Sequence, residues 1–347
     1  MIANLPRPRV FTWHIHGSYL FYLSQADIDI YIPVTTDRSE GYVGRGETFP
    51  FGNNVIEVPA AEVKDLELDC IIYQTNKNFL VDQYEILSLA QRQLPRIYLE
   101  HDPPHEHPVN ASHVVANEEG IRLVHVTHFN RLMWDSNKAH ATVIEHGVTD
   151  PGVQYTGNKE RGIVVINNLP QRGRICGFDI FKQISREVPI DLIGMGTEEH
   201  GLGEVLHPQL PAFISEYRFF FHPIRYTSLG LAVCEAMMMG IPVVGLATTE
   251  LGTVIENGRN GFIHTDLDYL ANKMKLLLQD KQLAHNIGME GRRTALERFS
   301  IQRFTNDWEN VIRSVIEMPV NAAQKRLHAQ QELNGTLNLR PIAINGF

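Results

Sequence analysis

A glycine followed five residues later by a glutamate is the part of the sequence best suited to binding a phosphorylated ligand. Gly230 opens a helical pattern, and because it has no Cβ a ligand phosphate could approach the backbone there. The first turn of a helix offers free N–H groups and partial positive charge, which favour anions. Glu235 follows one and a half turns later among apolar neighbours, where a carboxylate needs a partner. An apolar strand at 242–246 comes next, which predicts a nucleotide site at the carboxyl ends of parallel strands.

A longer pattern surrounds this pair of residues. It begins at Pro223, continues through Glu235-Ala236-Met237 and ends in the strand that starts at Pro242. The pattern resembles the donor-site signature of the retaining glycosyltransferases of family 4, which have the GT-B fold. The positions that match in register are Pro223, Tyr226, Gly230, Leu231, Glu235, Ala236, Met237, Gly240, Pro242, Val243 and Val244, followed by residues 254–258 and 261–263.

The resemblance assigns donor contacts to this segment. It implies that Glu235 accepts hydrogen bonds from the ribose hydroxyls of a nucleotide, whereas the alternative is a helical glutamate that is exposed or ion-paired. The first glutamate of the family's pair is Thr227 here. Thr227 can hydrogen-bond a sugar hydroxyl but carries no charge, so the bound sugar stays open. The donor-binding residues predicted in this segment are Tyr226, Thr227, Ser228, Leu229, Gly230, Leu231 and Glu235.

Two arginines flank a glycine in the loop expected after the strand at 162–166. The family places an Arg and then a Lys in this loop to hold the donor diphosphate, but Asn168 and Cys176 occupy those positions. Arg172 and Arg174 could supply the missing charge, because preorganised cations stabilise the charge that builds on a departing phosphate. The alternative is a solvated basic loop. We predict that Arg172 and Arg174 are catalytic.

A Gly-x-Gly turn ends the strand expected at 190–193. Gly194, Met195 and Gly196 resemble the family's turn beside the nucleotide base. Alone, such a turn is equally typical of an ordinary connection between a strand and a helix. The resemblance places Gly194 and Met195 in the donor site.

A second glycine loop ends the first predicted strand. The family has such a loop facing the cleft between its two domains, which implies that Gly17 contacts the donor and that Ser18 and Tyr19 lie on the acceptor side. His14 and His16 alternate with apolar residues, so both point the same way along the strand. For these two histidines a structural role and a binding role stay open.

His101 follows the strand predicted at 97–100. The family presents a histidine to the transferring sugar at the end of the corresponding strand, and His101 is our match for it. Three further histidines, His105, His107 and His113, raise the alternative of a metal site. Their spacings match no zinc pattern and no cysteine lies near them, so we predict no metal and no other cofactor.

Composition excludes several classes of protein. The chain has 347 residues, 43% of them hydrophobic and 20% charged, with a net charge of −9. The acidic balance does not indicate a nucleic-acid partner. Three separated cysteines (Cys70, Cys176 and Cys234) form neither a disulfide framework nor a zinc site, which fits a reducing cytoplasm. No signal peptide and no run long enough to span a membrane is evident.

Apolar strands alternate with helical patterns, which is typical of doubly wound α/β layers. We predict two Rossmann-like domains of a GT-B fold, with parallel sheets that face a cleft. The boundaries are 1–148 for an acceptor-side domain, 149–161 for a linker, 162–300 for a nucleotide-sugar domain, and 301–347 for a helix that crosses back and a tail. The strands are expected at 10–15, 28–34, 70–74, 97–100, 123–126, 142–145, 162–166, 190–193, 218–221 and 243–246.

The expected function is transfer of a hexose-type sugar, with retention, from a UDP- or GDP-sugar to a hydroxyl of a glycan, lipid-linked or small-molecule acceptor. We expect the protein to be located in the cytoplasm. Peripheral contact with the inner membrane face and the oligomeric state stay open. One alternative is an isomerase such as a UDP-sugar 2-epimerase, which needs cleft carboxylates as acid and base; the Glu-Ala-Met-x-x-Gly motif argues against it. Another is a non-catalytic relative that binds a nucleotide or glycan, to which Thr227 and the irregular phosphate loop point.

Overall fold

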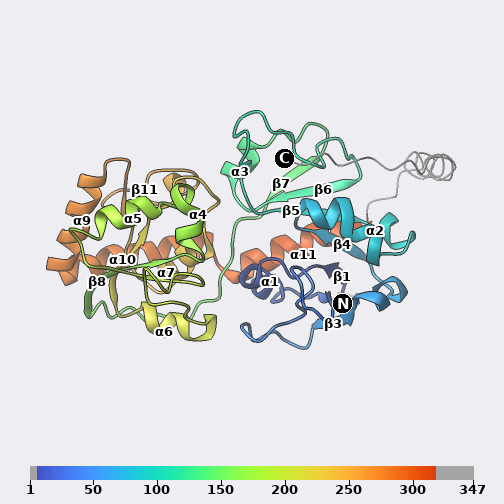
Figure 1. Cartoon of the computed structure of the whole chain (residues 1–347), viewed down its shortest axis with the longest axis horizontal. Helices are drawn as coiled ribbons and strands as arrows, with labels where there is room; N and C mark the ends of the chain where they lie inside the picture. Colours follow the sequence, from blue (N-terminus) through green and yellow to red (C-terminus); the bar gives the residue numbers. More distant parts are fainter. Residues whose placement is uncertain (1–5, 318–347) are drawn as a thin grey trace, which may run out of the picture.

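The structure, a computed structural model, describes residues 6–317 and consists of two lobes, each built on a parallel β-sheet (Figure 1). The sequence also predicts a short helix at 322–333 and a tail after it, and both lie outside the described residues. Both sheets carry helices on their faces, so their central strands are apolar on both sides. All residues of β4 (Cys70–Tyr73) and β10 (Tyr217–His222) are buried for this reason.

The first lobe holds a seven-stranded sheet in the order β3-β2-β1-β4-β5-β6-β7. Six of these strands were expected from the sequence; β3 was missed because only two of its five residues, Val55 and Val58, are buried and it ends at a proline. The strands besides β4 are β1 (Arg9–Thr12), β2 (Asp29–Val34), β3 (Val55–Pro59), β5 (Arg96–Glu100), β6 (Ile121–His125) and β7 (His140–Val143). The helical segments are α1 (Gly17–Leu23), η1 (Ala60–Asp65), η2 (Asn78–Asp82), α2 (Gln83–Ile86), η3 (Gln91–Gln93) and α3 (His128–Met133).

The second lobe holds a five-stranded sheet in the order β12-β11-β10-β8-β9. Its strands besides β10 are β8 (Lys159–Val165), β9 (Ile190–Ile193), β11 (Val243–Leu246) and β12 (Gly261–His264). β8 begins at Lys159 and therefore takes the last three residues of the segment expected as linker. The helical segments are α4 (Leu169–Cys176), α5 (Phe178–Ile184), η4 (His207–Gln209), α6 (Leu210–Ile214), α7 (Leu231–Met238), α8 (Leu251–Val254), α9 (Leu267–Gln279) and α10 (Lys281–Arg298).

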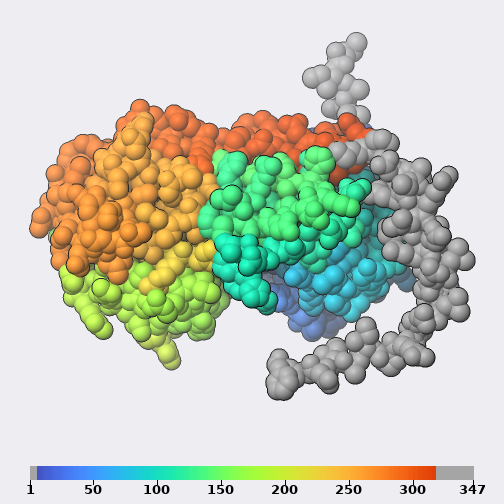
Figure 2. Space-filling model, turned by 90° about the horizontal axis from the view of Figure 1, so that it is seen from above, coloured from blue at the N-terminus to red at the C-terminus, as the bar shows by residue number. Residues whose placement is uncertain are grey.

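The last described helix, α11 (Ile301–Glu317), crosses from the second lobe to the first and packs against α1 and β4. The red-orange C-terminal segment runs along one side of both lobes (Figure 2). Phe304, Trp308 and Val315 lie on one face of this helix and are buried. The indole Nε1–H of Trp308 donates to the Tyr19 hydroxyl at 3.0 Å, which ties the crossing helix to α1 of the first lobe.

Charged groups hold the two lobes together beside this crossing. Glu250 lies before α8 in the second lobe, and its Oε2 accepts a hydrogen bond at 2.7 Å from the backbone N–H of Phe129 in the first. Its Oε1 accepts from Arg298, which also donates to Glu145 at 2.6 Å. Because Glu250 is buried, its charge needs these partners. The lobes are thus closed on each other around a shared cleft.

Candidate active site

A cleft of about 630 Å³ lies between the two lobes and is lined by residues of both. It brings together most of the side chains that the sequence singled out. The predicted site residues that line it are Gly17, Ser18, Tyr19, His101, Arg172, Met195, Thr227, Ser228, Leu229, Gly230 and Leu231. A second cavity of about 170 Å³ shares Ser18 and Leu231 with the cleft and adds Gly194 and Glu235.

Two predicted site residues stand outside these cavities. Tyr226 donates its hydroxyl to the Pro104 carbonyl oxygen at 3.0 Å, so it joins the lobes rather than facing the cleft. The Arg174 side chain is 77% exposed and pairs with Asp179 at 2.7 Å. The described structure therefore gives Arg174 no place at the candidate site.

Gly230 has the open surroundings that a close ligand approach requires. It precedes the first residue of α7, and a Cβ built on it would meet nothing within 4 Å. The first N–H groups of an α-helix have no intrahelical partner. The N-terminal residues of α7, Leu231 and Ala232, line the cleft. An anion in the cleft would thus meet the positive end of this helix.

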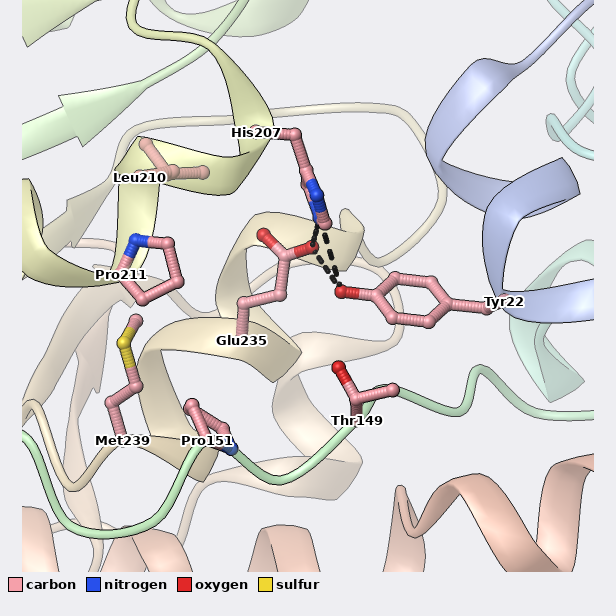
Figure 3. Close-up of a pocket in the computed structure, with 8 residues that line it drawn as sticks. All are labelled: Tyr22, Thr149, Pro151, His207, Leu210, Pro211, Glu235 and Met239. Atoms are coloured by element: carbon pink, nitrogen blue, oxygen red, sulfur yellow. Dashed lines mark hydrogen bonds and ion pairs between the residues drawn. The ribbon is translucent and has the colours of Figure 1, made fainter. Parts of the chain in front are cut away.

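Glu235 lies on α7 with its side chain 13% exposed. Its Oε1 accepts a hydrogen bond from the Tyr22 hydroxyl at 2.7 Å and from His207 Nε2 at 3.2 Å (Figure 3). Burial, followed by the nearby Glu235 carboxylate, raises the pKa of Tyr22, so Tyr22 stays a hydrogen-bond donor. Glu235 is therefore a partnered, nearly buried carboxylate and not an exposed helical glutamate.

Residues Gly194 and Met195 form a turn that packs directly on the loop after β8. Gly194 has φ +144°, and a Cβ there would lie 2.5 Å from the Ile166 carbonyl oxygen, so only glycine fits. The Met195 N–H donates to Asn167 Oδ1 at 3.0 Å. The Met195 side chain is 44% exposed at the rim of the cleft. This turn forms one wall of the cavity that contains Glu235.

The segment expected as a phosphate loop is instead the helix α4, broken at Gly173 (φ 53°, ψ −131°). The break sends the two neighbouring arginines apart, because the helical path changes direction between them. Arg172 lines the cleft, whereas Arg174 turns to Asp179 at the surface. Arg172 is the one Lys or Arg among the described residues that line this cleft.

His101 is buried at the first-domain wall of the cleft, and Gln74 fixes its ring. Gln74 Nε2 donates to the Trp13 carbonyl oxygen at 2.8 Å and to Thr12 Oγ1 at 2.9 Å, so Gln74 Oε1 must face the histidine. His101 Nε2 lies 3.0 Å from that oxygen and therefore carries the proton. Burial, with smaller effects of His16 and His146, holds the pKa of His101 well below its usual value. The neutral ring is left with Nδ1 as an acceptor.

The backbone carbonyl of His101 is already engaged across the lobes. It accepts hydrogen bonds from the hydroxyl of Ser228 and, at 3.1 Å, from Asn130 Nδ2. The family resemblance implies that this histidine meets the transferring sugar, and with the carbonyl engaged its ring is the group left to do so. Thr227 donates its hydroxyl to the Ser228 carbonyl oxygen at 2.9 Å and keeps lone pairs that can accept.

The two histidines of the first strand have separate surroundings. His14 Nδ1 lies 2.5 Å from the Gly44 carbonyl oxygen, which is a structural contact. His16 stands in the cleft with its ring centroid 4.0 Å from that of His101. Burial lowers the pKa of His16, and burial raises the pKa of Asp102, which also lines the cleft. His14 therefore has a structural contact, whereas His16 lines the cleft and its binding role stays a prediction.

The other histidines do not gather around a common centre. His113 is buried and pairs with Glu100 at 3.0 Å, while His105 lies 4.0 Å from Asp102 at the surface. Within residues 6–317, no three side chains of His, Cys, Asp or Glu stand close enough to hold a metal ion. In the same range, no helix is both long and apolar enough to cross a membrane.

Sequence reasoning missed several polar residues at the site. Tyr22 and His207 hold Glu235, and Gln74 orients the His101 ring. Asn130 donates to the His101 carbonyl oxygen, and Asp102 lines the cleft. A proline directly after His207 marks the start of η4, but nothing local to these residues signals contact with a carboxylate far away in the chain. Asp102 had a local signal, because it follows His101 at the end of β5.

Comparison with known proteins agrees with the second lobe. Residues 181–280 match the family of glycosyl transferases group 1. This range contains the Gly-x-Gly turn, the first turn of α7 and Glu235. The chain is 29% identical over 91 residues to N-acetyl-alpha-D-glucosaminyl L-malate synthase of Bacillus anthracis, which is 26% of this chain and 24% of that protein. The aligned segment is thus about a quarter of the length of this curated relative.

Solved structures match both lobes. Sucrose-phosphate synthase from Thermosynechococcus elongatus superposes with a TM-score of 0.67 at 14% identity, over 89% of this chain and 99% of that one. The Anabaena protein HepE in complex with UDP gives a TM-score of 0.65 at 14% identity, over 89% of this chain and all of that one. The fold is GT-B. At such identities the likeness establishes the fold alone.

Proposed function

We propose that this protein is a glycosyltransferase that moves a hexose-type sugar from a UDP- or GDP-sugar to an acceptor hydroxyl with retention of configuration. One observation carries the proposal: a single cleft joins the open N-terminus of α7 at Gly230, the Arg172 side chain and the oriented ring of His101. The adjoining cavity, which holds Glu235 and the Gly194 turn, is the proposed nucleoside site. A diphosphate in the cleft would lie between that cavity and the first lobe.

In this proposal each group has a separate task. The N–H groups of α7 and the Arg172 guanidinium stabilise charge on the leaving phosphate. Glu235 accepts a hydrogen bond from a ribose hydroxyl, and His101 Nδ1 accepts one from the sugar or the incoming hydroxyl. Attack on the same face as the departing phosphate, which takes the acceptor's proton, needs no enzyme nucleophile. The acceptor, a glycan, lipid-linked or small molecule, would enter beside Ser18 and Tyr19.

The likeness in fold to a protein crystallised with UDP supports a nucleotide as the ligand of the second lobe. Incubation with a panel of nucleotide-sugars, with and without simple acceptors, tests the function. Release of free nucleotide together with a glycosylated acceptor is the expected result.

Two rival functions have an observation in their favour. Asp102 lines the cleft with a raised pKa, which suits the acid or base of an isomerase, and such an enzyme would interconvert the sugar without an acceptor. Arg172 alone supplies cationic side-chain charge to the described cleft, which suits a non-catalytic nucleotide-binding protein. The same panel separates them, because binding without turnover identifies the second.

Replacement of Glu235 by Ala is expected to weaken nucleotide binding about tenfold or more. The change removes a hydrogen bond to a charged group, which contributes roughly 1.5–3 kcal/mol. Calorimetric titration of UDP and GDP measures the effect, with Glu256→Ala as the control because Glu256 lies at the surface of the same lobe, 66% exposed. Unchanged affinity in a folded Glu235→Ala variant would remove Glu235 from the nucleotide site.

Transfer is expected to continue in excess EDTA. The positive charge that a metal would supply to the diphosphate comes here from α7 and Arg172. The measurement is the initial rate of nucleotide release before and after chelation. Complete loss of activity, restored by Mg²⁺, Mn²⁺ or Zn²⁺, would show that transfer requires a metal ion. The histidines near Asp102 would then be the candidate ligands.

A further inference from the structure

The Glu235 carboxylate has two unlike oxygens. Oε1 receives both the Tyr22 hydroxyl at 2.7 Å and His207 Nε2 at 3.2 Å, which fills its two lone pairs. Oε2 receives no hydrogen bond from any described residue, and it points away from Tyr22 (Figure 3). A ribose hydroxyl would therefore be accepted by Oε2.

Tyr22 contacts the Glu235 carboxylate from outside the proposed nucleoside cavity. Glu235 lines both the proposed nucleoside cavity and a separate cavity of about 50 Å³, and Tyr22 lines only the second of these. His207 lines both. A nucleotide in the first cavity would thus leave the Tyr22 hydrogen bond in place.

Tyr22 belongs to the other lobe. It lies on α1 of the first domain, 213 residues before Glu235, and its side chain is buried. The aromatic rings of Phe21 and His207 pack near it at centroid distances of 5.3 and 6.0 Å. The hydroxyl can reach Glu235 only when the two lobes lie as close as they do here.

We propose that Tyr22 is a positioning residue for the nucleotide, which aims Glu235 Oε2 at the ribose when the lobes are closed. The inference rests on the proposed function, and it gives the first domain a part in holding the nucleotide. A glutamate side chain has several rotamers, and a second bond to its far oxygen selects one of them before the ligand arrives. Nucleotide affinity should therefore depend on whether the two lobes are closed.

The test is Tyr22→Phe, which keeps the packed ring and removes only the hydroxyl. Tyr73→Phe is the matched control, because Tyr73 is a buried tyrosine of the same lobe whose hydroxyl donates to Gln83 at 2.8 Å, and it lines neither the cleft nor the cavities at Glu235. The probes are UDP and GDP with their 2′-deoxy and 3′-deoxy forms, titrated by calorimetry. We expect Tyr22→Phe to weaken the preferred nucleotide about tenfold and to shrink its preference over the deoxy forms, with Tyr73→Phe unchanged in both.

A double-mutant cycle separates positioning from a general loss of stability. In a Glu235→Ala background, Tyr22→Phe should have no further effect on nucleotide affinity, since the carboxylate that it positions is gone. Full additivity of the two changes overturns the inference, and so does wild-type affinity of Tyr22→Phe. If the wild-type protein binds neither nucleotide, the proposed function fails and this inference fails with it; binding by the wild type with an unaffected Tyr22→Phe rejects the inference alone.

Discussion

Replacement of His101 by Ala is expected to lower the transfer rate about a hundredfold while free-nucleotide affinity stays nearly unchanged. The His101 ring lines the cleft on the first-domain side, across from the proposed nucleotide cavity in the second lobe. Gln74 sets its proton on Nε2 and leaves Nδ1 to orient a reacting group. Small losses of alignment at the reacting centre cost about this factor. The decisive comparison is nucleotide affinity, by calorimetry, against transfer rate in the same variant.

His125→Ala is the control for this experiment. His125 is a buried histidine on the neighbouring strand β6 that does not line the cleft, and burial lowers its pKa to about 3. Its loss should affect the unfolding temperature but leave the transfer rate of the folded protein unchanged. A His101→Ala variant that loses both nucleotide binding and transfer would show that His101 supports the fold. A variant that keeps both would put the reaction elsewhere.

Replacement of Arg172 by Ala is expected to lower turnover roughly a hundredfold to a thousandfold, the effect of removing one preorganised donor from developing negative charge. Nucleotide-sugar affinity should fall much less, because the charge that Arg172 meets grows in the transition state. Arg172 is the one cationic side chain among the described residues of this cleft, so no neighbour there can replace it. The measurements are kcat and KM with the donor identified by the panel.

Arg174→Ala is the matched control, two residues along the same helix. Its guanidinium pairs with Asp179 outside the cleft, so turnover should stay close to that of the wild type. Arg172→Lys should keep part of the activity, since it retains the charge but not the planar donors. Equal losses in the two alanine variants would mean that general surface charge matters, and wild-type turnover in Arg172→Ala would move the role to the N–H groups of α7.

The parts of the site that could be predicted from the sequence are those that one strand–turn–helix unit holds together. Gly230 directly precedes α7 and Glu235 lies on it, so their spacing fixes their geometry wherever that helix packs. Gly194 was predicted from the local Gly-x-Gly pattern after a strand, although the close contact with the Ile166 carbonyl oxygen that allows no side chain there comes from the neighbouring strand. The alternation of apolar strands and helices predicted two domains with parallel sheets, because each strand and helix can be recognised from the pattern of its own segment.

Only the tertiary structure decided which side chains meet across the chain. Arg172 and Arg174 are equivalent in sequence, and the break of α4 at Gly173 puts one in the cleft and the other on Asp179. Ser228 reaches the His101 carbonyl oxygen over 127 residues, and Tyr22 reaches Glu235 over 213. Such pairings depend on how the two lobes pack against each other. A hydrogen bond between residues far apart in the chain produces no recognisable pattern in either segment of sequence. The sequence by itself therefore determined the part of the candidate site that we propose for the nucleotide, and the closed packing of the lobes determined which side chains face it.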